Sequence, residues 1–178
     1  MRRLRAGGVI AYPTEAVYGL GCDPLDRRAV QRILDIKRRP LAAGLILIAA
    51  DFSQVEDFLL PLPPALRRRV FATWPGPVTW LLPCRPEAPV WLRGRHDSLA
   101  VRVTAHPTAA ALCIRFGGAL VSTSANPRGR NPARTPLQVR RYFGDTVDHV
   151  LTAPLGGQAR PSELRDGRTL AVVRAGYA

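Results

Sequence analysis

The stretch that decides the fold is VIAYPTEAVYGLG, residues 9–21. Its first four residues, Val9–Tyr12, form an apolar run that predicts a short buried strand. Pro13 ends this strand, because proline lacks a backbone N–H and has a fixed φ. The remainder includes Gly19 and Gly21 and is rich in residues that favour turns. We therefore predict a strand followed by a turn-rich segment.

The next segment predicts an amphipathic helix. Asp26 can cap a helix that runs to about Arg39. Pro40 stops it, because proline disfavours a helical conformation in the residue before it. The residues close to one stripe of this helix are Val30, Ile33, Leu34 and Lys37.

Strands and helices alternate along the rest of the chain. Apolar runs of strand length are Leu45–Ala49, Val78–Leu82, Leu99–Val103, Ala119–Ser122, Val147–Leu151 and Leu170–Arg174. Helical patterns cover Phe52–Leu60, Ala65–Thr73, Thr108–Phe116 and Pro136–Phe143. Residues 74–77 predict a turn, and residues 123–126 a loop after a strand. This alternation predicts an α/β domain, and it leaves parallel and antiparallel strand pairing open.

Length and composition predict one globular domain over residues 1–178. The chain has 47% hydrophobic and 22% charged residues, with no repeat or linker between domains. No apolar run approaches the roughly 20 residues of a membrane helix, and the basic start lacks the apolar core of a signal peptide. We therefore expect a cytoplasmic protein without a membrane partner. Cys22, Cys84 and Cys113 are far apart and predict reduced thiols rather than disulfides or a zinc site.

The formal net charge of +13 favours a polyanionic partner such as a nucleotide or nucleic acid. Of the 26 basic residues only Lys37 is a lysine, so arginine is the default cation of this chain. Lysine is a compact point charge, whereas arginine is a planar fork. The position of Lys37 is therefore more informative than the total charge.

Several classes of catalyst lack support in the sequence. It contains no GxxxxGK[ST] loop, no GxGxxG fingerprint and no GxSxG elbow. His96, His106 and His149 lack the spacing of metal ligands, so we expect surface or structural roles for them. Covalent and metal-dependent hydrolytic mechanisms are therefore disfavoured.

Polar side chains gather at the ends of the apolar runs, where ligand crevices of α/β sheets lie. They are Thr14, Lys37, Arg39, Arg102, Ser122, Ser124 and Asn126. Two kinds of cation, hydroxyls and an amide suit an anion, and together they predict a nucleotide site. Taken singly, Thr14 could instead cap a turn, Arg102 could be paired on the surface, and residues 122–126 could satisfy their own backbone.

Seven motifs occur in an order that resembles the YrdC-domain family, the threonylcarbamoyl-AMP synthases. They are PTEAVYGLGCDP at 13–24, KRRP at 37–40, GLILIA at 44–49, WPGPVTWLLP at 74–83, SLAVRVTAHP at 98–107, STSAN at 122–126 and PSELRD at 161–166. The resemblance covers nearly the whole chain. It implies a single domain with a twisted mixed sheet flanked by helices, a basic concave face and a shortened N-terminal helix.

The resemblance also implies a reaction. L-threonine, bicarbonate or CO2, and ATP would give threonylcarbamoyl-AMP and pyrophosphate, with Mg2+ brought by ATP and no protein ligand for it identified. A complex of partner proteins would then transfer the threonylcarbamoyl group to adenosine 37 of tRNA, and direct contact with tRNA stays open. Alternatives are a non-catalytic module that binds double-stranded RNA or tRNA or matures ribosomes, and the carbamoyl-transfer role of longer hydrogenase-maturation proteins.

The same resemblance assigns residues to two sides of a site. On the threonine side it places Thr14, Arg102, Ser122 and Ser162. On the nucleotide side it places Lys37, Arg39, Ser124, Asn126 and Arg174, with Lys37 and Arg39 also catalytic. Charge accumulates on phosphate oxygens during such a reaction, so cations and positioning can do most of the work without a protein nucleophile.

Overall fold

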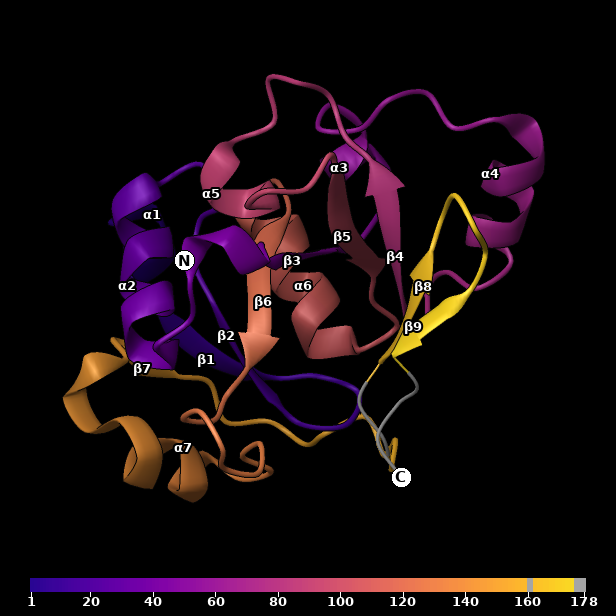
Figure 1. Ribbon diagram of the computed structural model, residues 1–178. Coiled ribbons are helices and arrows are strands. Elements are labelled where there is room, and N and C mark those ends of the chain that lie inside the picture. Colours follow the sequence, from indigo (N-terminus) through magenta and orange to yellow (C-terminus); the bar gives the residue numbers. More distant parts are fainter. Residues whose placement is uncertain (160–161, 175–178) are drawn as a thin grey trace.

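The described residues, 1–159 and 162–174, form one mixed sheet of nine strands in a computed structural model (Figure 1). The strands are β1 (Ile10–Pro13), β2 (Tyr18–Gly21), β3 (Ile46–Ala49), β4 (Val78–Pro83), β5 (Ser98–Val103), β6 (Leu120–Ser124), β7 (His149–Val150), β8 (Glu163–Asp166) and β9 (Val172–Arg174). The helices are α1 (Arg2–Arg5), α2 (Arg27–Lys37), α3 (Ser53–Glu56), α4 (Pro64–Phe71), α5 (Val90–Arg93), α6 (Pro107–Phe116) and α7 (Pro136–Phe143). Two 3-10 turns are η1 (Leu41–Ala43) and η2 (Gly144–Thr146).

The strand order is β7-β1-β2-β6-β3-β5-β4-β8-β9. Three neighbouring pairs are parallel, namely β1 with β7, β3 with β5 and β4 with β8. The other five pairs are antiparallel. The α/β class is therefore confirmed, and the mixed pairing is what the sequence had left open. Among the described residues, no helix has the length and apolar character that crossing a membrane requires.

The segment after Pro13 is a second strand, so the prediction of a turn-rich segment there was wrong. Only residues 14–17 form the turn, and Tyr18 already pairs with Pro13. A Cβ added at Gly21 would lie 2.6 Å from the carbonyl oxygen of Val121 and 2.7 Å from Cε1 of Tyr12. Glycine occurs here because a neighbouring strand and a tyrosine ring approach closely, which is a strand role and not a turn role.

Other boundaries also differ from the predictions. Asp26 caps α2 as expected, with its side chain accepting from two backbone N–H groups, but the helix ends at Lys37 because Arg38 is left-handed, with φ 47°. The strand before residues 123–126 continues to Ser124, so part of the predicted loop is sheet. The helix predicted over Phe52–Leu60 has only one turn. Helix α5 and strand β8, of four residues each, were not predicted.

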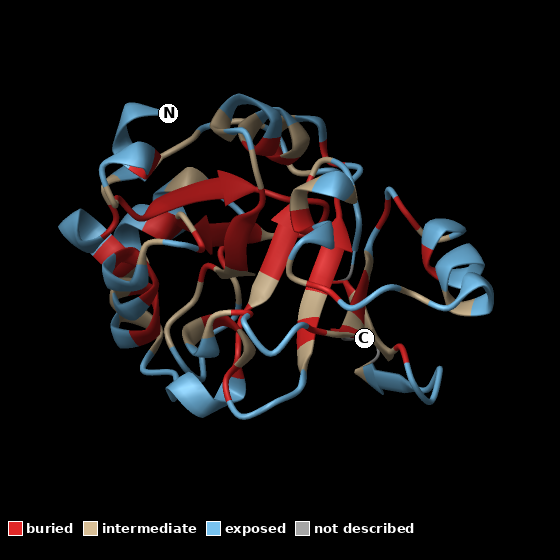
Figure 2. Cartoon of the chain, turned by 90° about the horizontal axis from the view of Figure 1, so that it is seen from above, coloured by how far each residue is buried: buried red, intermediate tan, exposed pale blue. Residues whose placement is uncertain are grey.

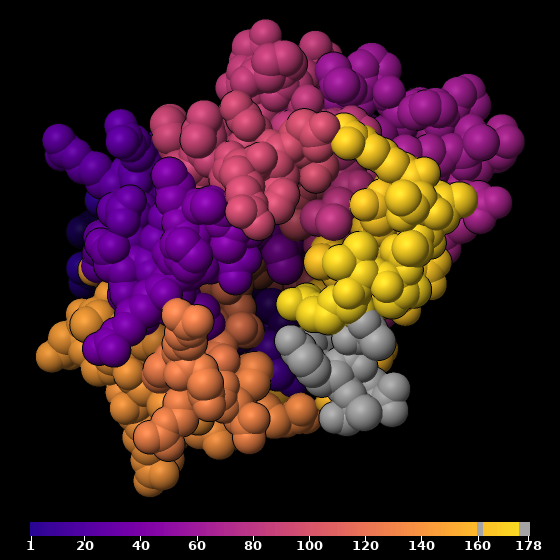
Figure 3. Space-filling view, viewed as in Figure 1, coloured from indigo at the N-terminus to yellow at the C-terminus, as the bar shows by residue number. Residues whose placement is uncertain are grey.

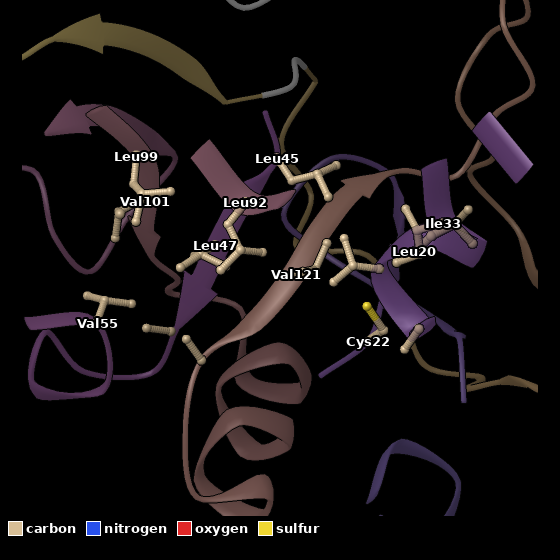
Figure 4. Close-up of a cluster of buried hydrophobic side chains, with 14 of the residues drawn as sticks. Leu20, Cys22, Ile33, Leu45, Leu47, Val55, Leu92, Leu99, Val101 and Val121 are labelled. Carbon is tan, nitrogen blue, oxygen red and sulfur yellow. The ribbon is translucent and has the colours of Figure 1, made fainter. Parts of the chain in front are cut away.

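Two hydrophobic clusters cover the two faces of the sheet. One contains Leu47, Val101 and Val121 from three strands, packed with Ile33 of α2 and Leu92 of α5 (Figure 4). The other contains residues that alternate with these along the strands, together with α1 and α6; its members are Leu4, Ile10, Tyr12, Ile48, Ala109, Cys113 and Leu120. Figure 2 shows the buried central strands in red and the outer sides of the helices in pale blue. Because side chains alternate across a strand, this second face also receives Arg102.

The cysteines and histidines have the structural roles expected of them. Cys22, Cys84 and Cys113 are buried free thiols. His96 and His149 are exposed. His106 is buried and caps α6, where its Nδ1 accepts from the backbone N–H of Ala109 at 3.3 Å.

Candidate functional site

Arg102 and Ser122 lie on the same face of the sheet, on neighbours of β3. Ile48 pairs with Arg102 of β5, and Ile46 pairs with Ser122 of β6. Paired residues of adjacent strands project to the same side, as do residues two apart on one strand. The second hydrophobic cluster covers part of this face, and the two polar side chains occupy another part. Two of the predicted threonine-side residues therefore project from the same face, on either side of β3.

Arg102 is buried and forms an ion pair with Glu15. Its Nη2 lies 3.4 Å from Oε2 of Glu15, and both side chains are 8% exposed. The alternative of a surface ion pair is therefore wrong. Neither Nε of Arg102 nor Oε2 of Glu15 has a hydrogen-bond partner in the part of the chain that the structure describes. Buried charged groups with open hydrogen-bonding capacity are costly, and such groups are typical of functional sites.

Thr14 starts the turn between β1 and β2. Its Oγ1 donates to the carbonyl oxygen of Val17 at 2.7 Å, and its backbone N–H donates to the same oxygen at 3.0 Å. The interpretation of Thr14 as a turn cap is therefore confirmed. This role leaves the lone pairs of the hydroxyl oxygen able to accept a hydrogen bond, so binding a ligand is compatible with capping.

Ser162 adjoins the same face from the start of β8. Its Oγ accepts from Oγ1 of Thr79, at 3.0 Å, and both residues are buried. Thr79 precedes Trp80, which pairs with Val101, so alternation puts Thr79 on the face of Arg102. Tyr12 lies on this face as well, and burial raises the pKa of its phenol, opposed by a hydrogen bond with Ser122. Threonine, serine and tyrosine hydroxyls thus share this face of the sheet with a buried guanidinium.

Lys37 connects the end of α2 to the end of β6 and the loop that follows. Its Nζ donates to the carbonyl oxygens of Ser124 and Asn126 and to Oδ1 of Asn126, each at 2.6 Å. Burial, with a smaller effect of nearby Arg39, lowers the pKa of Lys37 to about 8. Three acceptors use all three N–H groups of an ammonium. A phosphate that contacts Lys37 must therefore displace at least one of them.

The loop held by Lys37 is itself ordered by hydrogen bonds. Oγ of Ser124 donates to Oδ1 of Asn126 at 2.7 Å, and Nδ2 of Asn126 donates to the carbonyl oxygen of Arg130 at 2.5 Å. Ser124 lies two residues after Ser122 on β6, so both project to the same face. Strand β6 therefore connects the threonine-side and nucleotide-side residues.

Arg39 and Arg174 bring two further cations to this side. Nε of Arg39 donates to the carbonyl oxygen of Gly44 at 2.9 Å, and Nη2 to that of Ala43 at 3.1 Å. Partial burial and the charge of Arg174 both lower the pKa of Arg39. Arg174 in turn donates from Nη2 to the carbonyl oxygen of Ser162, at 3.5 Å. Two like charges that repel each other in this way favour binding of an anion near both.

The predicted residues therefore form two connected groups on one side of the molecule. Figure 3 shows that side hollowed between α2, the loop after β6 and the β8–β9 hairpin, with indigo atoms from the N-terminal part of the chain inside the hollow. A separate cavity of about 660 Å³ between α1 and α6 contains none of the predicted residues. Sequence reasoning missed Glu15 and Thr79, although both lie inside the family motifs beside residues that it selected.

No group of three histidine, cysteine or acidic residues placed to hold a metal ion occurs among the residues described. The Mg2+ expected with ATP stays a prediction, as does the basic character of the concave face. The assignment of individual residues to threonine or nucleotide also stays a prediction, because the geometry shows only where the side chains lie.

Comparisons with known proteins agree with this architecture. The family model Sua5_yciO_yrdC, described as telomere recombination, matches residues 2–176. A Nitrosococcus oceani protein named threonylcarbamoyl-AMP synthase is 62% identical over 168 residues, 94% of this chain and 91% of that protein. A Halorhodospira halophila protein with the same name is 58% identical over 171 residues, 96% and 90% of the two chains.

Among solved structures, P. abyssi Sua5 complexed with L-threonine has a TM-score of 0.86 and 32% identity, covering 93% of this chain and 48% of that one. The matched residues span almost the whole sequence, and the identities are high over most of its length. This chain belongs to the Sua5/YciO/YrdC family.

Proposed function

We propose that this chain is a threonylcarbamoyl-AMP synthase, which converts L-threonine, bicarbonate or CO2, and ATP into threonylcarbamoyl-AMP and pyrophosphate. One observation carries the proposal: β6 places Ser122 on the same face of the sheet as the buried guanidinium of Arg102, and it places Ser124 against the ammonium of Lys37. The first surroundings suit the single carboxylate of an amino acid, and the second suit a polyphosphate. The names of the relatives at 62% and 58% identity support the same activity.

On the threonine side, Arg102 is proposed to hold the substrate carboxylate. Arginine presents a planar fork that matches a carboxylate, and burial strengthens such an interaction because little water competes for it. Thr14, Ser122 and Ser162 are proposed to contact the rest of the amino acid. P. abyssi Sua5 forms a crystalline complex with L-threonine, which supports this substrate class.

On the nucleotide side, Lys37, Arg39 and Arg174 are proposed to face the phosphates, with Ser124 and Asn126 beside them. The threonine amine first takes up CO2 to give a carbamate. A carbamate oxygen then bonds to the α-phosphorus of ATP, and the bond between that phosphorus and the bridging oxygen breaks to release pyrophosphate. Negative charge grows on the leaving oxygens, and fixed cations stabilise it. No protein nucleophile is required, and Mg2+ would arrive with ATP.

The test is pyrophosphate release by the purified chain, with each substrate omitted in turn. We expect release only when L-threonine, bicarbonate, ATP and Mg2+ are all present, together with an AMP-linked product. Threonine-independent release, or no release from folded protein, would contradict the proposal. Lys37→Ala and Arg102→Ala should each lower release by about a hundredfold or more, since each removes a charged group from the site. Full activity in both variants would exclude this site.

Transfer of the threonylcarbamoyl group to adenosine 37 of tRNA by a complex of partner proteins is proposed on the same family basis. A purely RNA-binding module is not favoured, because the curated relatives named above are called synthases.

A further inference from the structure

The ion pair between Glu15 and Arg102 is not arranged to maximise stability. Both side chains are 8% exposed, and the contact of 3.4 Å leaves Nε of Arg102 and Oε2 of Glu15 without hydrogen bonds among the described residues. Taking two charges out of water costs several kcal/mol per ion, which is recovered only with excellent geometry. A buried pair with open hydrogen-bonding sites is therefore better explained by a role in binding.

The two oxygens of the Glu15 carboxylate have different partners. Oε1 accepts from Oγ1 of Thr104 at 2.6 Å and from the backbone N–H of Ala105 at 3.2 Å. Thr104 is fixed in turn, because its Oγ1 accepts from the backbone N–H of His106 at 3.1 Å. Oε1 thus anchors the carboxylate to the end of β5, and Oε2 faces Arg102. A carboxylate held at one oxygen presents its other oxygen to the guanidinium from a fixed position.

The backbone around Glu15 also holds the segment 151–158, which we call the strap. Gly156 N–H donates to the carbonyl oxygen of Thr14 at 3.1 Å, and Gln158 N–H donates to that of Glu15 at 2.9 Å. A Cβ added at Gly156 would lie 2.9 Å from Cα of Glu15, so the strap packs directly on this residue.

Two side chains fasten the strap further along. Tyr18 Oη donates to the carbonyl oxygen of Ala153 at 3.0 Å. Nε2 of His106 lies 3.1 Å from the carbonyl oxygen of Pro154. It donates to this oxygen, because Nδ1 of the same ring accepts from the backbone N–H of Ala109. Glu15 therefore lies between the strap and Arg102, held from both sides.

We propose that Glu15 is a positioning residue for substrate binding: its carboxylate orients Arg102 toward the threonine carboxylate without touching the substrate or the reacting atoms. This inference rests on the proposed function and on the proposed role of Arg102. It predicts a selective effect. Substitution of Glu15 should weaken threonine binding, while ATP binding and turnover at saturating threonine should change little, since Lys37, Arg39 and Arg174 are not among its contacts.

The informative variant is Glu15→Gln. Its amide oxygen can still accept from Thr104 and Ala105, but its amide nitrogen cannot accept from Arg102. We expect the KM and the Kd for L-threonine to rise by about tenfold to a hundredfold, since the negative charge that faces Arg102 is lost. The KM for ATP and kcat at saturating threonine should stay within about twofold.

Asp148→Asn is the matched control. Asp148 also pairs with an arginine, at 2.9 Å from Nη1 of Arg32, and accepts from the backbone N–H of Val9 at 2.6 Å. The Asp148→Asn variant makes the same chemical change, carboxylate to amide, away from the site. It should therefore alter thermal stability without a selective effect on threonine binding. Thr104→Val is the second test, because it keeps the charge of Glu15 and removes one of the two donors to Oε1. It should raise the Kd for threonine by a few-fold.

Calorimetric titration with L-threonine and steady-state kinetics of all four proteins decide between the outcomes. Absence of threonine-dependent pyrophosphate release from the wild type would contradict the proposed function, and the titrations would still report on Glu15. If Glu15→Gln binds threonine as the wild type does, or if its KM values for threonine and ATP rise equally, the positioning role is excluded. If Glu15→Gln does not fold, an unchanged threonine Kd in Thr104→Val excludes it.

Discussion

The single lysine of this chain has a role that an arginine could not take over. Three oxygen atoms accept from Nζ of Lys37, each at 2.6 Å, and they belong to Ser124 and Asn126. A compact ammonium can satisfy three converging oxygens, whereas a planar guanidinium spreads its donors along a fork. Lys37 therefore orders Ser124 and Asn126 before any nucleotide arrives, in addition to its proposed contact with phosphate.

The lowered pKa of Lys37 predicts a pH dependence of nucleotide binding. Its pKa of about 8 means that the ammonium becomes neutral as the pH rises through that value. We expect the affinity for ATP to fall above pH 8, by up to about tenfold per pH unit for one linked proton. Titration calorimetry between pH 7.5 and 9.5 measures this. The exposed neighbour supplies a control, since Arg38→Lys should leave the midpoint unchanged, and a flat profile would contradict the prediction.

The stability of the ligand-free protein should respond in the opposite sense. The pKa of Lys37 is lower in the folded state than its ordinary value of 10.5. Between pH 8 and pH 10.5 this side chain therefore binds more protons in the unfolded chain than in the folded protein. Stability from this group therefore rises with pH from about 8 towards 10.5, as burial of the charge is relieved. The neutralisation of Lys37 would therefore weaken ATP binding above pH 8 without itself destabilising the fold.

At the scale of elements, the hairpin of β1 and β2 positions residues that are proposed to bind threonine. Its turn contains Thr14 and Glu15, and its second strand pairs with β6, which bears Ser122 and Ser124. A Cβ at Gly19 would lie 3.4 Å from Oγ of Ser122, so the absence of a side chain there leaves room beside that hydroxyl. The hairpin and β6 together form one wall of the site.

The close approach at Gly21 gives a prediction for this hairpin. In Gly21→Ala the new methyl would meet the carbonyl oxygen of Val121 at 2.6 Å and the ring of Tyr12 at 2.7 Å. We expect a loss of about 2 kcal/mol or more in the free energy of unfolding, since backbone and a buried ring must shift. Urea denaturation provides the measurement. Gly118→Ala is the control, because its nearest atom would be 4.0 Å away, and equal losses in both variants would refute the steric argument.

At the scale of the whole molecule, the site joins segments that are far apart in the sequence. The N-terminal turn, the end of α2, the middle strands and the C-terminal hairpin all contribute, and the hollow in Figure 3 lies where they meet. Arg39 and Arg174 come from opposite ends of this arrangement, and the charge of Arg174 lowers the pKa of Arg39. An anion bound near both arginines would relieve this repulsion and connect the two parts of the fold.

Pyrophosphate should therefore stabilise the protein against heat. A ligand that binds only the folded state at a hundred times its Kd adds about 2.7 kcal/mol. We expect pyrophosphate to raise the Tm of the wild type in differential scanning calorimetry, and to raise that of Arg39→Ala much less. Arg38→Ala should retain the full shift, since Arg38 is not among the residues proposed to face the phosphates. Chloride at equal ionic strength controls for screening, and an equal shift in both variants would contradict the arrangement.

The sequence by itself determined the α/β class and the cap of α2 at Asp26, and its motifs selected the two sets of residues that are proposed as the site. These depend on local periodicity and on short motifs, so they can be read without knowing what is adjacent in space. It could not identify β2, because glycines at 19 and 21 are typical of turns until a neighbouring strand and Tyr12 are seen to need the space. The partner of Arg102 was equally hidden.

Only the tertiary structure decided that Glu15 is buried against Arg102, that all three protons of Lys37 are already engaged, and that Thr14 caps its own turn. Each of these contacts joins residues that only the order of the strands or the local turn brings together. Such contacts arise from burial and from strand order, which mixed pairing of nine strands leaves undetermined in the sequence.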